Sequence, residues 1–363
     1  MIRLCPTEQF VNESSDRRVI AIGAGKRLLA FLSKWNVRIA YAVDNDLQKQ
    51  GLFIEGFDIQ IESWDFLVNN LRKDDLIVIT PNKFTDLLEQ VQSLDNTEEN
   101  QLYILDAMER LQYDLDRQKI ARVPVSFRQH EMPLIPKIIH FFWFSGDPFP
   151  EQVQQCIDSW KRFCPDYEIR KWDLTNYDYS SNRFAREAIE HRKWAFASDF
   201  GRADVVFRYG GIYLDTDVEL VRSIDDLLYH DAFIGFESSE YIDPGSGFGA
   251  APGNPVIKAF CDIYKDKRFV LDDGQLNTMP CPRYYTSVLD AHGLKRDGSF
   301  QLLDGIAVYP YYSFCPHSHV TNKIYMDSDT YSIHHHAGGW MDKTDYPLKE
   351  LIRQTYVDGE TAI

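Results

Sequence analysis

The segment from Arg208 to Asp217, RYGGIYLDTD, constrains the fold of this 363-residue chain more than any other. A helical pattern over Ala195–Phe207 ends at a glycine pair, and a short apolar strand then leads to Asp215 and Asp217. Because residues i and i+2 of a strand point to the same face, the spacing predicts that these two carboxylates lie together. The segment therefore predicts a helix, a tight glycine turn and a strand that ends in an acidic pair.

The acidic pair is a candidate site for a hard divalent cation. Mn2+ and Mg2+ accept carboxylate oxygens and keep positions open for water and substrate phosphates. Asp199 and Arg202 share one face of the preceding helix, where the carboxylate suits sugar hydroxyls and the guanidinium suits a phosphate or sugar oxygen. The alternatives are a solvated turn for the Asp-x-Asp tripeptide alone and an intrahelical ion pair for Asp199 and Arg202.

An apolar segment upstream and a histidine cluster downstream are further candidates. Ile138–Phe144 is typical of a buried parallel strand, and Trp143 lies near its end. Ligands of open α/β sheets bind outside the carboxyl ends of strands, so Trp143 either stacks on a nucleobase or belongs to the core. His334, His335 and His336 bring together three imidazoles, which by themselves suit a transition metal.

Taken with its flanks, the acidic segment resembles the signature of the DXD-containing glycosyltransferase family 32. That group includes capsular polysaccharide transferases and yeast mannosyltransferases, and the clostridial glucosylating toxins have a similar core. The blocks that carry the resemblance are PKIIHFFWF (136–144), SW (159–160), CPDY (164–167), ASD (197–199) with Arg202, YGGIYLDTDVE (209–219) and HHHAGGW (334–340). The resemblance covers about 136–340.

The resemblance implies a GT-A type α/β fold with a central mixed sheet. It implies retaining transfer of a hexose from a nucleoside-diphosphate sugar, with UDP-linked sugars first, to a glycan or lipid-linked glycan acceptor in bacterial capsular or surface polysaccharide synthesis. The catalytic residues that it implies are Asp199, Arg202, Asp215 and Asp217. The donor-binding residues that it implies are Trp143, Asp199, Arg202, Tyr213, Asp215 and Trp340.

The resemblance also implies a Mn2+ or Mg2+ ion, which Asp215, Asp217 and one histidine of the last block would hold. His335 is the first choice for that ligand and His334 is the second. The sequence departs from the family where His336 replaces a common Trp and Gly339 replaces a usual Ser. A hydroxyl contact from position 339 is therefore absent.

The composition excludes some classes of function. A formal net charge of −16 argues against a nucleic-acid partner, because binding to a phosphate backbone depends on basic patches. The six cysteines are scattered and include no C-x-x-C pair, as in a reduced, cytosolic protein. No apolar segment approaches the ~18 residues of a membrane span. We expect a cytoplasmic protein without a transmembrane segment, and a lipid-linked acceptor would bring it to the inner membrane face.

The N-terminal third predicts a separate Rossmann-like parallel α/β domain, because short apolar segments alternate with amphipathic ones. Gly23-Ala24-Gly25 follows its first strand, and Asp44 ends the second, as in a dinucleotide-binding unit. Leu28 stands where a third glycine is expected. We therefore favour glycines that only make a tight turn over a true cofactor site.

Proline spacing and apolar patterns predict the remaining organisation. We expect an accessory domain over 1–123, a linker over 124–136, a transferase domain over 137–345 and a tail over 346–363. Within the transferase domain, the patterns predict a helix over Glu151–Phe163, one long helix over Phe184–Tyr209, strands over Val218–Ile224 and Ala232–Phe236, and a flexible loop over Gly245–Gly249. Met279–Thr286 falls where the family builds part of its acceptor pocket.

Two other functions remain as alternatives. A metal-dependent nucleotide-sugar hydrolase would use the histidine cluster with Asp215 and Asp217, and stimulation by a glycan acceptor would distinguish it from a transferase. A nucleotide-sensing scaffold would instead be centred on Gly23-Ala24-Gly25, with the transferase site inactive. The presence of both DXD carboxylates, of Arg202 and of Trp340 argues against a scaffold.

Overall fold

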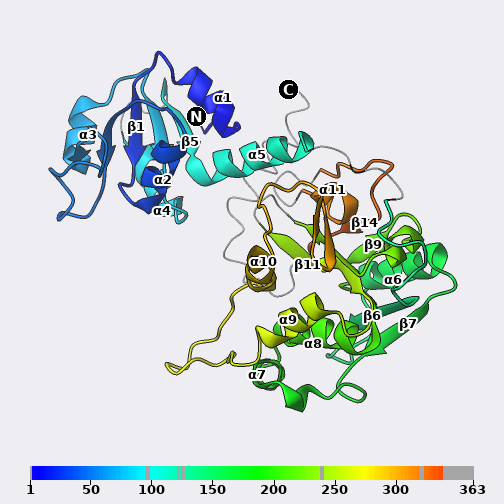
Figure 1. Cartoon of the computed structure of the whole chain (residues 1–363). Coiled ribbons are helices and arrows are strands. Elements are labelled where there is room, and N and C mark those ends of the chain that lie inside the picture. The colour runs from blue at the N-terminus through cyan, green and yellow to red at the C-terminus, as the bar shows by residue number, and fades with distance from the viewer. Residues whose placement is uncertain are drawn as a thin grey trace. The chain divides into compact units, whose positions relative to one another are not determined.

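The computed structural model describes residues 2–94, 99–120, 123, 127–237, 241–318 and 323–337 (Figure 1). The chain divides into two compact units between Gln118 and Lys119. Of the expected linker, the described residues 127–136 belong to the second unit, where Ile135 is buried in the core. Trp340 and the expected tail over 346–363 lie outside the described residues.

The first unit is built on a five-stranded parallel sheet with the order β3-β2-β1-β4-β5. Its strands are β1 (Val19–Ile22), β2 (Ile39–Val43), β3 (Ile61–Glu62), β4 (Leu76–Ile79) and β5 (Gln101–Ile104). Its helices are α1 (Thr7–Glu13), α2 (Lys26–Lys34), α3 (Trp64–Asn70), α4 (Thr85–Gln92) and α5 (Leu105–Gln118). Every residue of β1 and β4 is buried, which fits a parallel sheet covered on both faces.

The second unit is built on a seven-stranded mixed sheet with the order β12-β13-β10-β11-β8-β6-β7. Its strands are β6 (Ile138–Phe142), β7 (Glu168–Trp172), β8 (Gly211–Tyr213), β10 (Ala232–Phe236), β11 (Ile242–Ala250), β12 (Gln301–Leu303) and β13 (Ile306–Tyr309). Strand β6 is parallel to β7 and β8, and β11 is antiparallel to β8 and β10. A separate antiparallel pair joins β9 (Val218–Leu220) to β14 (Ser332–His334).

Helices cover this sheet and fix its central strands. They are α6 (Glu151–Phe163), α7 (Arg183–Glu190), α8 (Trp194–Tyr209), α9 (Pro255–Asp262), α10 (Cys281–Ala291) and α11 (Tyr311–Phe314), with the 3-10 turns η2 (Tyr179–Ser181) and η3 (Asp225–Tyr229). Helix α8 contacts β6, β8 and β11 and packs beside α7 and α9 (Figure 1). Helix α6 contacts β9, and the Trp160 indole N–H donates to Val218 O at 2.8 Å. Helix α6 therefore anchors the strand that follows the DXD segment.

The glycine pair between α8 and β8 is required by close packing. Gly210 and Gly211 have φ of 64° and 96°, which favours glycine, and a Cβ at Gly211 would lie 2.7 Å from Ile138 O. Gly210 O accepts a hydrogen bond from His140 Nε2 at 2.8 Å, while His140 Nδ1 accepts one from the Trp172 indole at 3.1 Å. Burial lowers the pKa of His140 to about 4, so the ring is neutral and links the turn to two strands.

Three local expectations are wrong. The long helix is two helices, because Arg192 adopts φ of 54° between α7 and α8. The strand expected over Val218–Ile224 ends at Leu220, and Asp225 begins a 3-10 turn. The expected loop over Gly245–Gly249 lies inside β11, whose pairing with β10 shifts register there.

Among the described residues, no helix has both the length and the apolar character needed to cross a membrane.

Candidate active site

The two DXD carboxylates lie close together, but for a different reason from the one expected. Strand β8 ends at Tyr213, so Asp215 and Asp217 lie in a turn, where the Val218 N–H donates to Asp215 O at 3.1 Å. The alternation of a strand therefore does not orient them. The turn aims both carboxylates towards His334, and single ligand atoms of these three residues all lie within 4.8 Å of one another.

His334 reaches the acidic pair because β14 pairs with β9. In that register His334 lies opposite Val218, the residue after Asp217. His334 Nε2 lies 3.3 Å from Asp217 Oδ1, and its Nδ1 lies 2.8 Å from Asp243 Oδ2. Two carboxylates and an imidazole form a suitable set of ligands for Mn2+ or Mg2+, and a carboxylate behind the imidazole is the usual way to orient a ligating histidine.

His335, the first choice for a metal ligand, lies outside this group. Its side chain pairs with Glu219 instead, and its Nε2 lies 2.9 Å from Glu219 Oε2. Its backbone N–H donates to Asp217 O at 3.0 Å. Strand β14 ends at His334, and its pairing with β9 brings His334, the second choice, beside the acidic pair, whereas His335 follows the strand.

Negative charge accumulates around His334. Burial alone would raise the pKa of Asp217, but the His334 imidazole beside it holds that pKa well below its usual range. Burial raises the pKa of Asp215. The Arg202 guanidinium lowers this pKa, and the Asp217 charge raises it further, so the pKa stays above its ordinary value. Burial would lower the pKa of His334, but Asp217 and Asp243 raise it well above its usual range. A protonated imidazole therefore supplies the positive charge here when no metal ion is bound.

Asp199 and Arg202 extend the site from helix α8. They are 6% and 4% exposed, so they are not a solvated ion pair. Arg202 Nη2 lies 3.1 Å from Asp199 Oδ1 and 3.4 Å from Asp215 Oδ1. Burial raises the pKa of Asp199 to about 7 despite the neighbouring guanidinium. The helix and the DXD turn therefore meet in one buried charge network.

Tyr213 joins the same network, and Trp143 lies at the expected strand end. The Tyr213 hydroxyl donates to Asp215 Oδ1 at 2.7 Å, and the Arg202 guanidinium lies 4.9 Å from the Tyr213 ring centroid. Trp143 follows β6, where its indole N–H donates to Asp147 O at 2.7 Å and its ring packs edge-on against Phe149. Half-buried, Trp143 is neither a deep core residue nor a freely exposed one.

Two residues of β11 lie beside the acidic pair: Asp243, which was not expected there, and Gly245, which begins the expected flexible loop. Asp243 is buried and accepts from the Gly245 N–H at 2.8 Å as well as facing His334. Gly245 O accepts from the Asp215 N–H, and a Cβ at Gly245 would collide with Asp215 Oδ2. The available signal was the GSGFG run that begins two residues after Asp243, which we interpreted only as a flexible loop.

The glycine turn of the first unit is hydrogen-bonded to the Asp44 carboxylate, and residues of the chain supply the hydrogen-bond donors to this carboxylate. Asp44 Oδ2 accepts from the Ala24 N–H and from Lys49 Nζ, each at 2.9 Å, and Oδ1 accepts from the Asp46 N–H at 3.0 Å. Burial opposes ionisation, but these hydrogen bonds hold the pKa of Asp44 below its ordinary value. In a dinucleotide-binding unit the acidic residue at this position binds a ribose hydroxyl. Here Asp44 bonds to the glycine turn and closes it.

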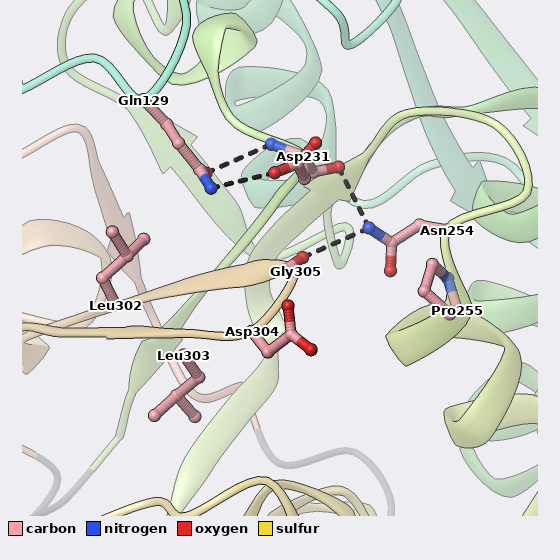
Figure 2. Close-up of a pocket in the computed structure, with 8 residues that line it drawn as sticks. All are labelled: Gln129, Asp231, Asn254, Pro255, Leu302, Leu303, Asp304 and Gly305. Atoms are coloured by element: carbon pink, nitrogen blue, oxygen red, sulfur yellow. Dashed lines mark hydrogen bonds between the residues drawn. The ribbon is translucent and has the colours of Figure 1, made fainter.

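Two surface hollows of the second unit differ in their relation to the DXD turn. The first, of about 500 Å3, is lined by Gln129, Asp231, Asn254, Pro255, Leu302, Leu303, Asp304 and Gly305 (Figure 2). There Gln129 and Asn254 donate to Asp231, and Asn254 also donates to Gly305 O. The second, of about 570 Å3, is lined by Glu151, Gln152, Gln155, Cys156, Glu219 and His335. It borders the DXD segment through Glu219.

Comparisons with known proteins point to one class. Residues 150–234 match the family described as a glycosyltransferase sugar-binding region containing a DXD motif. Inositol phosphoceramide mannosyltransferase 3 of Schizosaccharomyces pombe is 32% identical over 133 residues, which cover 34% of this chain and 35% of that protein. Glycosyltransferase L373 of Acanthamoeba polyphaga mimivirus is 22% identical over 57% of this chain and 84% of its own length.

Among solved structures, the PaToxG glycosyltransferase aligns with a TM-score of 0.35 and 18% identity, over 49% of this chain and 73% of that chain. The chain spans only 35% of the length of the fission yeast mannosyltransferase. The family segment and the named relatives support a transferase enzyme of the DXD glycosyltransferase class on an α/β fold. The matched segment contains Asp199, Arg202 and both DXD carboxylates.

Proposed function

We propose that the second unit is a metal-dependent, retaining hexosyltransferase that uses a nucleoside-diphosphate sugar and a glycan or lipid-linked glycan acceptor. We place the reaction in bacterial capsular or surface polysaccharide synthesis, and a UDP-sugar is the first donor to test. Relatives named mannosyltransferases make GDP-mannose the second. The observation that carries the proposal is the meeting of Asp215, Asp217 and His334 within 4.8 Å, next to the buried Asp199–Arg202 pair.

The chemistry of this ligand set fits a hard cation. Asp215 and Asp217 offer carboxylate oxygens, and His334 offers one imidazole nitrogen because Asp243 holds the other. Bound Mn2+ or Mg2+ would act as a Lewis acid and stabilise the charge that grows on the departing diphosphate. In this proposal Asp243 fixes the orientation of the His334 ring.

The remaining residues would bind and orient the sugar. Arg202 is held between Asp199 and Asp215, and a fixed guanidinium presents its N–H groups to sugar or phosphate oxygens at little entropic cost. Asp199 accepts sugar hydroxyls best when it is ionised. Trp143 offers a half-buried ring to the nucleobase. Trp340 is proposed to close over the donor, and it lies outside the described residues.

The hollow beside Glu219 is the candidate place for the acceptor. Its carboxylates, amides and imidazole suit the hydroxyls of a sugar. The resemblance implies that Met279–Thr286, where α10 begins, also forms part of the acceptor pocket. A retaining route by front-face attack fits the absence of an obvious covalent nucleophile in the sequence, and the configuration of the product tests it.

A donor screen tests the proposal. Purified protein is mixed with Mn2+ and each common UDP-sugar or GDP-mannose, and released nucleotide is measured with and without EDTA and a panel of glycan acceptors. We expect one donor to be turned over only with metal, and an acceptor to accelerate turnover and yield a retained linkage by NMR. Metal-dependent release that no acceptor stimulates would favour the hydrolase instead.

The scaffold alternative predicts a different result in the same screen. No donor would be turned over, while a dinucleotide would raise the melting temperature of the protein. Gly25→Trp would then abolish that shift, because the new side chain fills the turn at the start of α2. That combination would move the function to the first unit.

A further inference from the structure

A second group of metal-ligating side chains shares His334 with the DXD site. Cys315, His334 and His336 each offer one ligand atom, and these atoms all lie within 4.8 Å of one another. The transfer reaction proposed above uses neither Cys315 nor His336. A sulfur and two imidazole nitrogens also form a much softer set of ligands than the oxygens of Asp215 and Asp217.

The chain holds these three side chains together from two elements. Cys315 follows helix α11, is 1% exposed, and donates its backbone N–H to Tyr311 O at 2.7 Å. His336 follows β14 and adopts φ of 50°, a left-handed conformation that a residue with a Cβ avoids without a reason. This conformation brings its ring to 4.2 Å from the His334 ring and its Nε2 to 3.1 Å from Cys315 Sγ.

We propose that Cys315, His334 and His336 form a Zn2+ site. Cysteine thiolate and neutral histidine are preferred zinc ligands, and three of them leave the fourth tetrahedral position for water. Mg2+ and Mn2+ prefer oxygen ligands and gain little from this set. As the bonds to the metal form, Cys315 Sγ releases its thiol proton and His334 Nε2 releases its imidazolium proton to solvent.

The shared histidine makes the two sites exclusive. Asp243 holds His334 Nδ1 at 2.8 Å, so one nitrogen, Nε2, is left for a metal, and it lies 3.3 Å from Asp217 Oδ1. One nitrogen cannot ligate two ions at once. Zn2+ bound to the softer group therefore removes a ligand from the DXD site and inhibits turnover. This consequence rests on the proposed function, whereas zinc binding itself does not.

Cobalt spectroscopy tests the site without any assay of activity. Metal-free protein, kept reduced with a phosphine, is titrated with Co2+ in place of Zn2+, and a thiolate-to-cobalt charge-transfer band reports a bound sulfur. We expect this band in the wild type, its loss on addition of one equivalent of Zn2+, and its absence in Cys315→Ser. Cys164→Ser is the matched control, because Cys164 is also 1% exposed and lies at the end of α6.

Zinc affinity gives the second readout. Loss of an outer-shell partner alone weakens metal binding about 10–100-fold, so we expect Cys315→Ser and His336→Ala each to weaken Zn2+ binding by at least about tenfold in calorimetry. His336 is half-buried, so its variant keeps the test open if Cys315→Ser does not fold. A wild type without the charge-transfer band, or a His336→Ala variant that binds Zn2+ as tightly as the wild type, overturns the proposal.

The inhibition is measured last. If a donor is turned over with Mn2+, we expect Zn2+ to inhibit the wild type and Cys315→Ser to need at least about tenfold more Zn2+ for the same inhibition. Equal inhibition of both would overturn the exclusive use of His334. If no donor is turned over, the proposed function fails, while the cobalt spectra still decide the zinc site.

Discussion

Asp44 and Asp217 each follow a strand of an α/β unit, and their surroundings differ in charge balance. Asp44 accepts two backbone N–H groups and one lysine ammonium, so the chain itself supplies its donors and its counter-charge. Asp217 belongs to a group of four carboxyl groups, with Asp199, Asp215 and Asp243, around the guanidinium of Arg202 and the imidazole of His334. Four acidic groups therefore share two cationic ones.

This difference separates a structural carboxylate from a candidate ligand. The hydrogen bonds to Asp44 hold its pKa below the ordinary value, so the residue is ionised and satisfied without a ligand. In the second unit burial raises the pKa values of Asp199 and Asp215, and the carboxylates of Asp217 and Asp243 raise the pKa of His334, which reflects the excess of negative charge there. A bound divalent cation would remove that excess. The charge balance is therefore what distinguishes the two carboxylates.

The largest expected effect comes from exchanging one carboxylate for an amide in each unit. Asp217→Asn would remove a charged ligand of the proposed metal ion, and a catalytic metal supplies several kcal/mol of transition-state stabilisation. At about 1.4 kcal/mol for each factor of ten, we expect metal-dependent donor turnover to fall by about 100-fold or more. Asp44→Asn should leave turnover unchanged. Initial rates at saturating Mn2+ measure both variants.

Two outcomes would contradict the contrast between Asp44 and Asp217. Full metal-dependent turnover by Asp217→Asn would show that the excess charge serves stability rather than metal binding. Loss of turnover in Asp44→Asn with an intact fold by circular dichroism would show that the first unit takes part in the reaction.

A smaller effect is expected from Asp243→Asn. The amide oxygen still accepts from His334 Nδ1, but the charge behind the imidazole is lost. Removal of such outer-shell partners typically lowers metal affinity about 10–100-fold, so the Mn2+ concentration for half-maximal turnover should rise by that factor while the rate at saturating Mn2+ changes less. Asp231→Asn, in the hollow of Figure 2, is the control for a carboxylate outside the site. An unchanged Mn2+ dependence would remove Asp243 from the metal site.

The sequence allowed the acidic pair and the Asp199–Arg202 pair to be found because their spacing is local. Two carboxylates separated by one residue meet in a turn as well as in a strand, so the expectation held although the reason for it was wrong. Helix α6 and strand β10 match the expected bounds, Glu151–Phe163 and Ala232–Phe236, because clear apolar patterns define them. The break at Arg192 was missed, since arginine gives no signal for a left-handed residue.

The choice between His334 and His335 could not be made from the sequence. It depends on the register of β14 with β9, which places His334 opposite Val218 and joins segments far apart in the chain. Asp243 was missed for a similar reason. Its contact with His334 requires the irregular course of β11, which the glycine-rich segment permits but does not specify.

The smallest expected effect comes from a variant that tests whether Asp44 has a structural role. Asp44→Ala leaves the Ala24 and Asp46 amides without their acceptor, and loss of such hydrogen bonds costs about 1–2 kcal/mol. Because a chain of two units need not unfold in one transition, hydrogen exchange at these two amides is the appropriate measurement. We expect faster exchange in the variant and unchanged Mn2+-dependent turnover.

The same variant has a pH dependence whose sign follows from the lowered pKa of Asp44. A carboxylate with a lowered folded-state pKa stabilises the fold above its unfolded value of about 3.9 and loses that contribution as the pH falls through its folded value. The difference in amide exchange between the wild type and Asp44→Ala should therefore be largest at neutral pH and disappear in acid. If amide exchange differs equally between the two proteins at both pH values, the stabilisation does not come from the ionised carboxylate. The contrast between Asp44 and Asp217 then loses its electrostatic basis.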